Sequence, residues 1–230
     1  MRIALQVLSA CLLAGGMSAG WANGGGGMSM PAAPPPMPRE RTPQQQAQDA
    51  YNDGVHEVKK ADKAQAAAAQ ATDAGKKDKA AHEAQDRYAG ALPRFQQATQ
   101  LDPTLHEAWN YVGYVNRKLG HYDEALAAYA KALTIKPGYA DALEYRGEAY
   151  LALNRIPDAQ QAYLDLYAGN RALAGKLLTA MKSWVADQRA KAVGGNAANL
   201  DDLDKWIQER AQIAGQTAAL TRAGTAARWR

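Results

Sequence analysis

Apolar side chains recur at helical spacing along most of the chain from residue 45 onward. Tyr51, Val55 and Val58 share one face of a predicted helix. A longer stripe follows at Tyr88, Ala91, Leu92, Phe95, Ala98 and Leu101. This pattern predicts helices over residues 45–70 and 77–101, with a polar break at residues 72–75. Because Pro93 lies inside the second helix, we expect a kink or a fresh helix start there.

The stretch between the two stripes is polar. Residues 59–86 are rich in Ala, Lys, Gln and Asp. We therefore expect a helical hairpin that extends beyond the packed core. Pro103 ends the second helix at Asp102, because proline disfavours helical geometry in the residue before it.

An internal repeat with a period of 34 residues follows this hairpin. Five pairs of identical residues have that spacing, which is hard to obtain by chance: Pro103 and Pro137, Ala108 and Ala142, Gly113 and Gly147, Ala125 and Ala159, Tyr129 and Tyr163. A period of this length is typical of helix–turn–helix repeats. Gly120 and Asn154 fall at the turns, where a left-handed residue commonly ends a helix.

The segment 106–139 resembles the tetratricopeptide repeat (TPR) family. It fills the family's signature positions with Trp109, Val112, Gly113, Ala125, Tyr129, Ala132 and Pro137. The segment 140–173 is a degenerate copy, because it has Arg146, Leu166 and Arg171 where the family usually has an apolar residue, alanine and proline. The resemblance implies an all-α, short TPR-type solenoid of helical hairpins.

The segment 47–105 is interpreted as a first repeat, split or extended by an insertion. Phe95 and Pro103 match the second helix of such a unit, and Gly54 matches the glycine of its first helix. The residues between them lengthen both helices into the N-terminal hairpin. Three units also meet the usual minimum for a stable array.

Two further helices are predicted at residues 171–189 and 200–214. They form C-terminal capping helices over residues 174–216, which a solenoid needs to cover its end. Residues 217–230 are expected to be a flexible basic tail, with Arg222, Arg228 and Arg230 near Trp229.

The N-terminus has the pattern of a secretory signal peptide over residues 1–22. Arg2 precedes a short apolar run, and small residues precede a cleavage site before Asn23. Residues 23–46 are Gly-, Met- and Pro-rich and predict a disordered linker. We therefore expect export, to the periplasm in a Gram-negative cell. An alternative is a lipid anchor at Cys11, which ends a lipobox-like sequence.

Composition and charge narrow the functional classes. Hydrophobic residues make up 47% of the chain, alanine supplies much of that share, and phenylalanine occurs once. This favours an all-α protein. The net charge of +4 is modest, and no basic face suggests nucleic-acid binding. No run is long and apolar enough for a transmembrane span.

The sequence lacks the usual motifs of catalysis and metal binding. None of its four histidines has the spacing of a zinc-binding pair, and there is no phosphate-binding loop. We therefore predict no catalytic residues, no metal site, no cofactor and no enzymatic activity.

Function is then expected in the concave groove that the resemblance implies. Certain positions of the family's repeat usually line this groove. In this chain they are occupied by Glu107, Asn110, Tyr114, Arg117, Lys118, Asp141, Glu144, Glu148, Leu151 and Ala152. Tyr51, Val55 and Val58 would extend it. The site we predict for a protein or peptide partner consists of Glu107, Asn110, Tyr114, Arg117, Lys118, Glu144 and Glu148.

Three hypotheses of function follow. The first is an exported scaffold or adaptor that binds a protein or peptide through the groove. The second is an accessory subunit of a cell-envelope enzyme, secretion or assembly complex that docks through the extended hairpin. The third is an enzyme with an unrecognised site.

Overall fold

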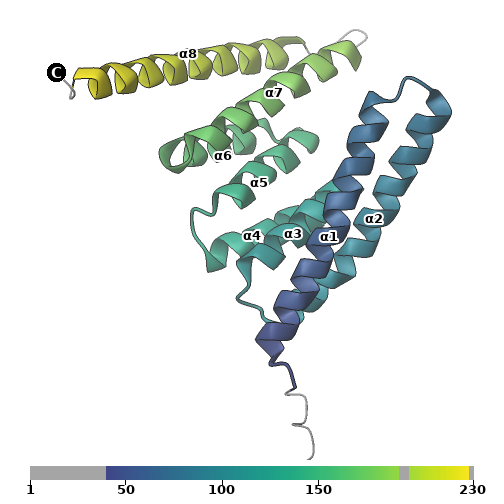
Figure 1. Cartoon of the computed structure of the whole chain (residues 1–230). Coiled ribbons are helices and arrows are strands. Elements are labelled where there is room, and N and C mark those ends of the chain that lie inside the picture. The colour runs from purple at the N-terminus through teal and green to yellow at the C-terminus, as the bar shows by residue number, and fades with distance from the viewer. Residues whose placement is uncertain (1–39, 192–196, 228–230) are drawn as a thin grey trace, which may run out of the picture. The chain divides into compact units, whose positions relative to one another are not determined.

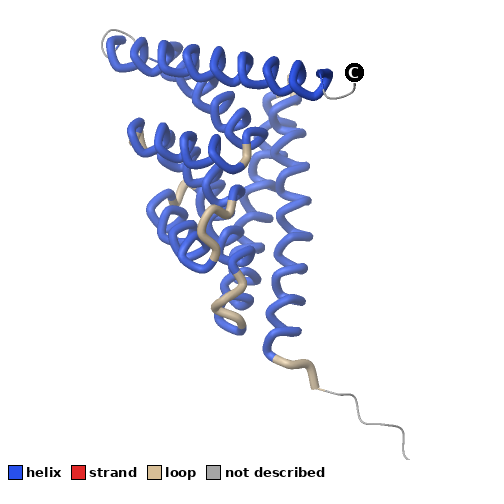
Figure 2. Tube along the Cα trace, turned by 90° about the vertical axis from the view of Figure 1, so that its left-hand side faces the viewer, coloured by secondary structure: helices blue, strands red, loops and turns tan. Residues whose placement is uncertain are grey.

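A computed structural model of the chain describes residues 40–191 and 197–227, and these contain eight α-helices and no strand (Figures 1 and 2). The helices are α1 (Pro43–Gln70), α2 (Ala74–Leu101), α3 (His106–Leu119), α4 (Tyr122–Ile135), α5 (Ala140–Ala152), α6 (Ile156–Gly169), α7 (Arg171–Lys191) and α8 (Ala197–Ala227). Consecutive helices pair as hairpins, and each hairpin packs on the next. The prediction of an all-α solenoid of helical hairpins is confirmed.

The long α1–α2 hairpin begins earlier than the sequence pattern suggested. Pro43 occupies the first turn of α1, where its missing N–H is not needed. Thr42 Oγ1 accepts a hydrogen bond from the Gln45 backbone, and Gln45 Oε1 accepts one from the Thr42 backbone, which together form a capping box. Residues 43–46 therefore belong to α1 rather than to the predicted linker.

The helix α2 continues without a break through Pro93, so the fresh helix start expected there is wrong. Proline removes the N–H that would bond the carbonyl of Ala89. Both Pro93 and Ala89 are exposed, so water can satisfy that carbonyl. The apolar face of the same turns, with Tyr88, Ala91 and Phe95 fully buried, holds the helix in place.

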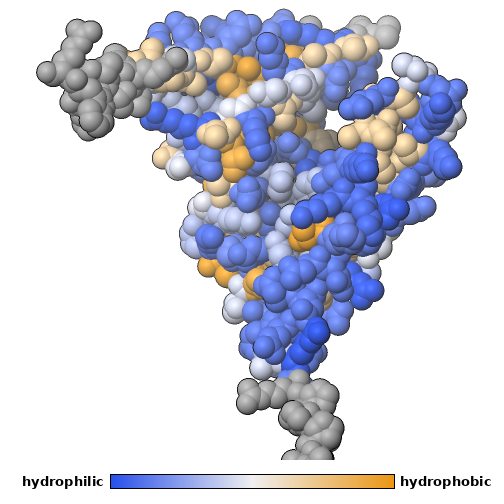
Figure 3. All heavy atoms as spheres, viewed as in Figure 1, coloured by the Kyte–Doolittle hydropathy of each residue, from blue (hydrophilic) through white to orange (hydrophobic). Residues whose placement is uncertain are grey.

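The hairpin is more closely packed than its polar sequence suggested. Within residues 59–86, the alanines at 61, 64, 68 and 84 are buried in the seam between α1 and α2. Hydrophilic side chains cover most of the visible surface of these helices (Figure 3). The prediction that this stretch lies beyond the packed core is therefore wrong for its inner face.

Glycines set the close approach of the two helices in successive hairpins. A methyl group on Gly113 of α3 would lie 2.5 Å from the ring of Tyr129 on α4. A methyl group on Gly54 of α1 would lie 2.7 Å from the ring of Phe95 on α2. The two contacts join equivalent family positions, although an insertion separates Gly54 from Phe95. This equivalence supports the interpretation of α1 and α2 as an extended first repeat.

The second repeat departs from this arrangement. The space above Gly147 of α5 is filled by Leu177 of α7, 2.6 Å from a methyl group at that position, instead of by the aromatic residue of its own hairpin. The predicted left-handed turns are present, with φ of 86° at Gly120 and 56° at Asn154. The repeat therefore keeps its turn but packs against the C-terminal helices.

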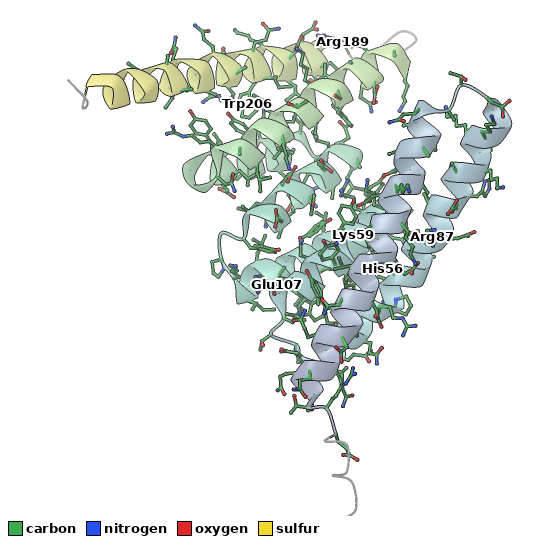
Figure 4. The ribbon with its side chains drawn as sticks, in the orientation of Figure 1. His56, Lys59, Arg87, Glu107, Arg189 and Trp206 are labelled. Atoms are coloured by element: carbon green, nitrogen blue, oxygen red, sulfur yellow. The ribbon has the colours of Figure 1, made fainter. Side chains whose placement is uncertain are left out.

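The helices α7 and α8 are joined by ion pairs as well as by apolar contacts. Arg189 on α7 donates to Asp201 at 2.7 Å and to Asp204 at 3.0 Å, both on α8. Trp206 extends from α8 toward the neighbouring helices, and its ring lies edge-on to Tyr163 on α6, with a centroid distance of 5.2 Å (Figure 4).

The helix α8 runs to Ala227, well beyond the end predicted near residue 214. The flexible tail predicted from residue 217 is thus helical as far as residue 227, consistent with its many alanines. Arg228, Trp229 and Arg230 lie outside the described residues, as do the signal peptide, Cys11 and the linker up to residue 39.

The glycine contacts give the first testable prediction. Gly113→Ala and Gly54→Ala should each lower the free energy of unfolding by about 1–3 kcal/mol, because the added methyl groups overpack buried rings. Gly90→Ala on α2 is the matched control, since a methyl group there meets nothing within 4 Å. It should raise stability by up to about 1 kcal/mol through helix propensity. Urea denaturation followed by circular dichroism measures all three, and destabilisation by Gly90→Ala as well would contradict the packing argument.

Candidate functional site

The first helices of successive hairpins line one face of the repeat array. In order along the chain, α1 contacts α3, α3 contacts α5, and α5 contacts α7. In the described part of the chain, α2, α4 and α6 make no comparable contacts with one another. We call the surface formed by α1, α3 and α5 the inner face. Every residue of the predicted partner site belongs to α3 or α5.

A row of four tyrosines crosses the inner face from α1 to α5, and we call it the tyrosine row: Tyr51, Tyr111, Tyr114 and Tyr145. Successive ring centroids are 5.6, 6.0 and 5.0 Å apart. All four side chains are partly exposed. Burial raises the pKa of Tyr51 and of Tyr145 to about 12, so the hydroxyl groups stay protonated at neutral pH.

The sequence pattern indicated Tyr51 and Tyr114 as groove residues but not Tyr111 and Tyr145. These two residues lie 34 positions apart, at the same place in the two repeats, so the repeat period already linked them. Their positions in the repeat are not among those that usually line the groove of the family. The structure brings all four rings into one continuous surface.

Arg117 occupies a site built by the tyrosine row and a carboxylate. Its guanidinium carbon lies 5.3 Å from the ring centroids of both Tyr114 and Tyr145. Its Nη1 lies 2.6 Å from the carboxylate of Glu148 on α5. The cation thus joins α3 to α5 through two aromatic faces and one ion pair. We call this arrangement the Arg117 cage.

The hairpin forms a wall of the inner face. Asp62 on α1 accepts hydrogen bonds from Tyr88 and from Tyr114, the latter at 2.7 Å. Lys118 Nζ donates to Gln65 Oε1 at 2.6 Å. Four of the seven predicted partner residues, namely Tyr114, Arg117, Lys118 and Glu148, therefore make contacts within the chain that shape this face.

Two of the other predicted residues are buried polar groups with unused hydrogen-bonding capacity. Asn110 on α3 is 3% exposed, and its Oδ1 has no hydrogen-bond partner. Glu144 on α5 is 5% exposed and forms no hydrogen bond or ion pair with the described residues. Burial raises the pKa of Glu144, although Lys176 on α7 acts in the opposite direction. Such groups usually cost stability unless they are paired.

The remaining predicted residue, Glu107, lies in the first turn of α3, on the repeats rather than on the hairpin that carries Lys59 and Arg87 (Figure 4). Its carboxylate is 3.0 Å from His106 Nδ1. Asp141 holds the equivalent place in the first turn of α5. Both carboxylates suit the positive end of a helix.

No group of three histidine, cysteine, aspartate or glutamate side chains suited to a metal ion occurs among residues whose positions the structure describes. No described helix is long and apolar enough to cross a membrane. The absence of catalysis and of a cofactor stays a prediction.

Comparison with known protein families finds the repeat directly. Residues 81–140 match one family described as tetratricopeptide repeat, and residues 117–182 match a second family with the same description. The two matches span α3 to α6 and reach into α2 and α7. A search of curated proteins gave no match.

Glu144 gives the second testable prediction. Glu144→Gln should raise the free energy of unfolding at neutral pH by on the order of 1 kcal/mol, because it removes a buried charge that no neighbour pairs. Since the folded-state pKa is raised, this penalty exists above that pKa and disappears as the pH falls through it. The difference between variant and wild type should therefore shrink toward about pH 4.

Urea denaturation at neutral and acidic pH measures the effect. Glu124→Gln, an exposed position in the first turn of α4, is the control and should lower the free energy of unfolding by up to about 1 kcal/mol, because it removes a favourable charge at the helix N-terminus. A destabilised Glu144→Gln variant at neutral pH would show that Glu144 has a stabilising partner in the fold.

Proposed function

We propose that this chain, which carries tetratricopeptide repeats in residues 81–182, is an exported scaffold or adaptor that binds a segment of a partner protein across its inner face. Repeats of this type generally mediate protein–protein interaction. The proposed module has no enzymatic activity and needs no cofactor. Its partner is a protein or a peptide rather than a nucleic acid.

The tyrosine row is the observation that carries the proposal. Tyrosine offers a large, rigid contact area with a polar end, and it is enriched at the residues that dominate binding energy. Four partly exposed rings lie in sequence across three helices. An extended segment laid along α1, α3 and α5 would meet each ring in turn. The intrachain contacts of Tyr114 and Arg117 keep this row rigid, which lowers the entropy lost on binding.

Export is the second part of the proposal. It is supported by the charged start, the short apolar run and the small residues that precede Asn23. In a Gram-negative cell the mature chain would act in the periplasm. The lipobox-like sequence at Cys11 supports the alternative of an anchored lipoprotein.

A second candidate function uses the far end of the α1–α2 hairpin. All residues from 72 to 79 are exposed, and Lys76, Lys77 and Lys79 gather there. The hairpin could dock an accessory subunit onto an envelope complex through this end. Deleting the whole hairpin cannot separate the two candidates, because it would also remove Asp62 and Gln65 from the inner face.

The third testable prediction separates the two surfaces. Tyr111→Leu combined with Tyr145→Leu should reduce recovery of the native partner by about tenfold or more, because the rings are lost while most apolar volume stays. Tyr150→Leu is the matched control on α5, since its ring lies against Arg155, away from the tyrosine row. Changing Lys76, Lys77 and Lys79 together to Glu tests the hairpin end.

The measurement is crosslinking and affinity purification of the tagged mature chain from the envelope of its own cells. Circular dichroism confirms that each variant is folded. Loss of partners only in the triple lysine variant would favour docking through the hairpin. Unchanged recovery in the double tyrosine variant would contradict binding at the inner face.

The fourth testable prediction concerns the compartment. The mature protein isolated from cells should begin at Asn23, because the small residues before it suit signal peptidase. N-terminal sequencing of material from the soluble envelope fraction measures this. A mature chain that starts at a lipidated Cys11 would establish the lipoprotein alternative, and an intact Met1 on cytoplasmic material would contradict export.

A further inference from the structure

We infer that the inner face holds a lysine or arginine side chain of the bound segment, in a site formed by Asp141, Glu144 and the rings of Tyr51, Tyr111 and Tyr145. This inference rests on the proposed function, because it names the chemistry of the segment that the inner face binds. We call these five residues the open cage.

The Arg117 cage provides the precedent within the same molecule. There, the chain's own guanidinium lies against Tyr114 and Tyr145 and pairs with Glu148. The arrangement demonstrates that this surface stabilises a cation with two tyrosine rings and one carboxylate. The open cage has the same kinds of parts one step further along the tyrosine row.

In the open cage, however, no cation pairs with the carboxylates, because Arg117, which lies against Tyr145, pairs with Glu148 of its own cage. Neither Asp141 nor Glu144 forms an ion pair with the described residues, although the Tyr139 hydroxyl donates a hydrogen bond to Asp141. Both carboxylates raise the pKa of Tyr145, and Asp141 also raises the pKa of Tyr51 and Tyr111, where burial is the larger cause. The charge of Asp141 thus acts on all three rings, and that of Glu144 acts on Tyr145.

Glu144 and Asn110 give an independent indication of a missing ligand. Asn110 is 3% exposed and its buried Oδ1 has no hydrogen-bond partner, and Glu144 is 5% exposed and forms no hydrogen bond or ion pair with the described residues. They occupy equivalent positions of the two repeats, 34 residues apart, on helices that contact each other. Acceptors call for a donor, and an ammonium or guanidinium group offers three or more N–H donors and a positive charge.

The stability of the fold accounts for the negative charge of Asp141 but not for that of Glu144. Asp141 lies in the first turn of α5, where it stabilises the helix without any ligand. Glu144 lies beyond that turn and is too buried for this role. Lys176 attracts its carboxylate from α7, yet burial outweighs that attraction and the pKa of Glu144 remains raised. A bound cation would supply the pairing that the fold does not.

The fifth testable prediction uses a random peptide library displayed on phage and selected on the full mature chain. The enriched peptides should share a lysine or arginine at a fixed position. A synthetic peptide of the enriched sequence, labelled for fluorescence anisotropy, then measures affinity. Replacing its basic residue with glutamine should weaken binding about tenfold or more, a change that corresponds to about 1.4 kcal/mol.

The variants assign the effect to the open cage. Glu144→Gln and Asp141→Asn should each weaken binding of the basic peptide several-fold and leave the glutamine peptide unaffected. Glu124→Gln removes the same charge from α4 and should change neither affinity. Because Glu144→Gln is expected to stabilise the fold, its loss of affinity could not result from unfolding.

The possible outcomes separate this inference from the proposed function. The enriched peptides could lack a basic residue and still fail to bind the Tyr111→Leu and Tyr145→Leu variant. This result would overturn the cation site in the open cage and would support binding at the inner face. Basic peptides that bind Glu144→Gln and Asp141→Asn as tightly as the wild type would also overturn the cation site. Failure to enrich any peptide that depends on the tyrosine row would overturn both.

Discussion

The contact between a glycine of one helix and an aromatic ring of its partner sets the geometry of this array. At Gly113 and Tyr129, and again at Gly54 and Phe95, the ring lies where a side chain would otherwise stand. The two helices of the hairpin can approach closely only because the glycine lacks a Cβ. The spacing of the two helices within each of these hairpins depends on these contacts, and the closely paired hairpins then stack so that α1, α3 and α5 form the inner face.

The tyrosine row follows from that order. Tyr111 and Tyr145 occupy equivalent places in their repeats. Because one repeat stacks on the next, both rings lie close to the ring of Tyr114. Tyr114 then links the two, and Asp62 of the hairpin fixes its hydroxyl. The insertion that lengthens α1 and α2 thus completes one wall of the inner face, which makes the hairpin part of the site as well as a separate candidate surface.

Sequence reasoning succeeded where a repeated pattern specified the structure and failed where single contacts decided it. The 34-residue period predicted the hairpins and the left-handed turns at Gly120 and Asn154. The pattern could not show that Arg117 pairs with Glu148, because family positions say which residues share a face and not which of them neutralise each other. Nor could it show that Asn110 and Glu144 are buried. The early start of α1 could have been predicted from the local sequence, because Thr42 and Gln45 form a capping box and Pro43 suits the first turn of a helix.

The buried Glu144 is the point at which stability and the proposed function diverge. Four predicted groove residues are paired within the chain and therefore contribute to the rigidity of the inner face. An unpaired carboxylate contributes nothing to that rigidity and costs free energy. A fold selected for stability alone would favour glutamine or an apolar residue at this position. A site that binds a cation explains the carboxylate, because the ligand supplies the missing charge and its binding energy offsets the cost of burial.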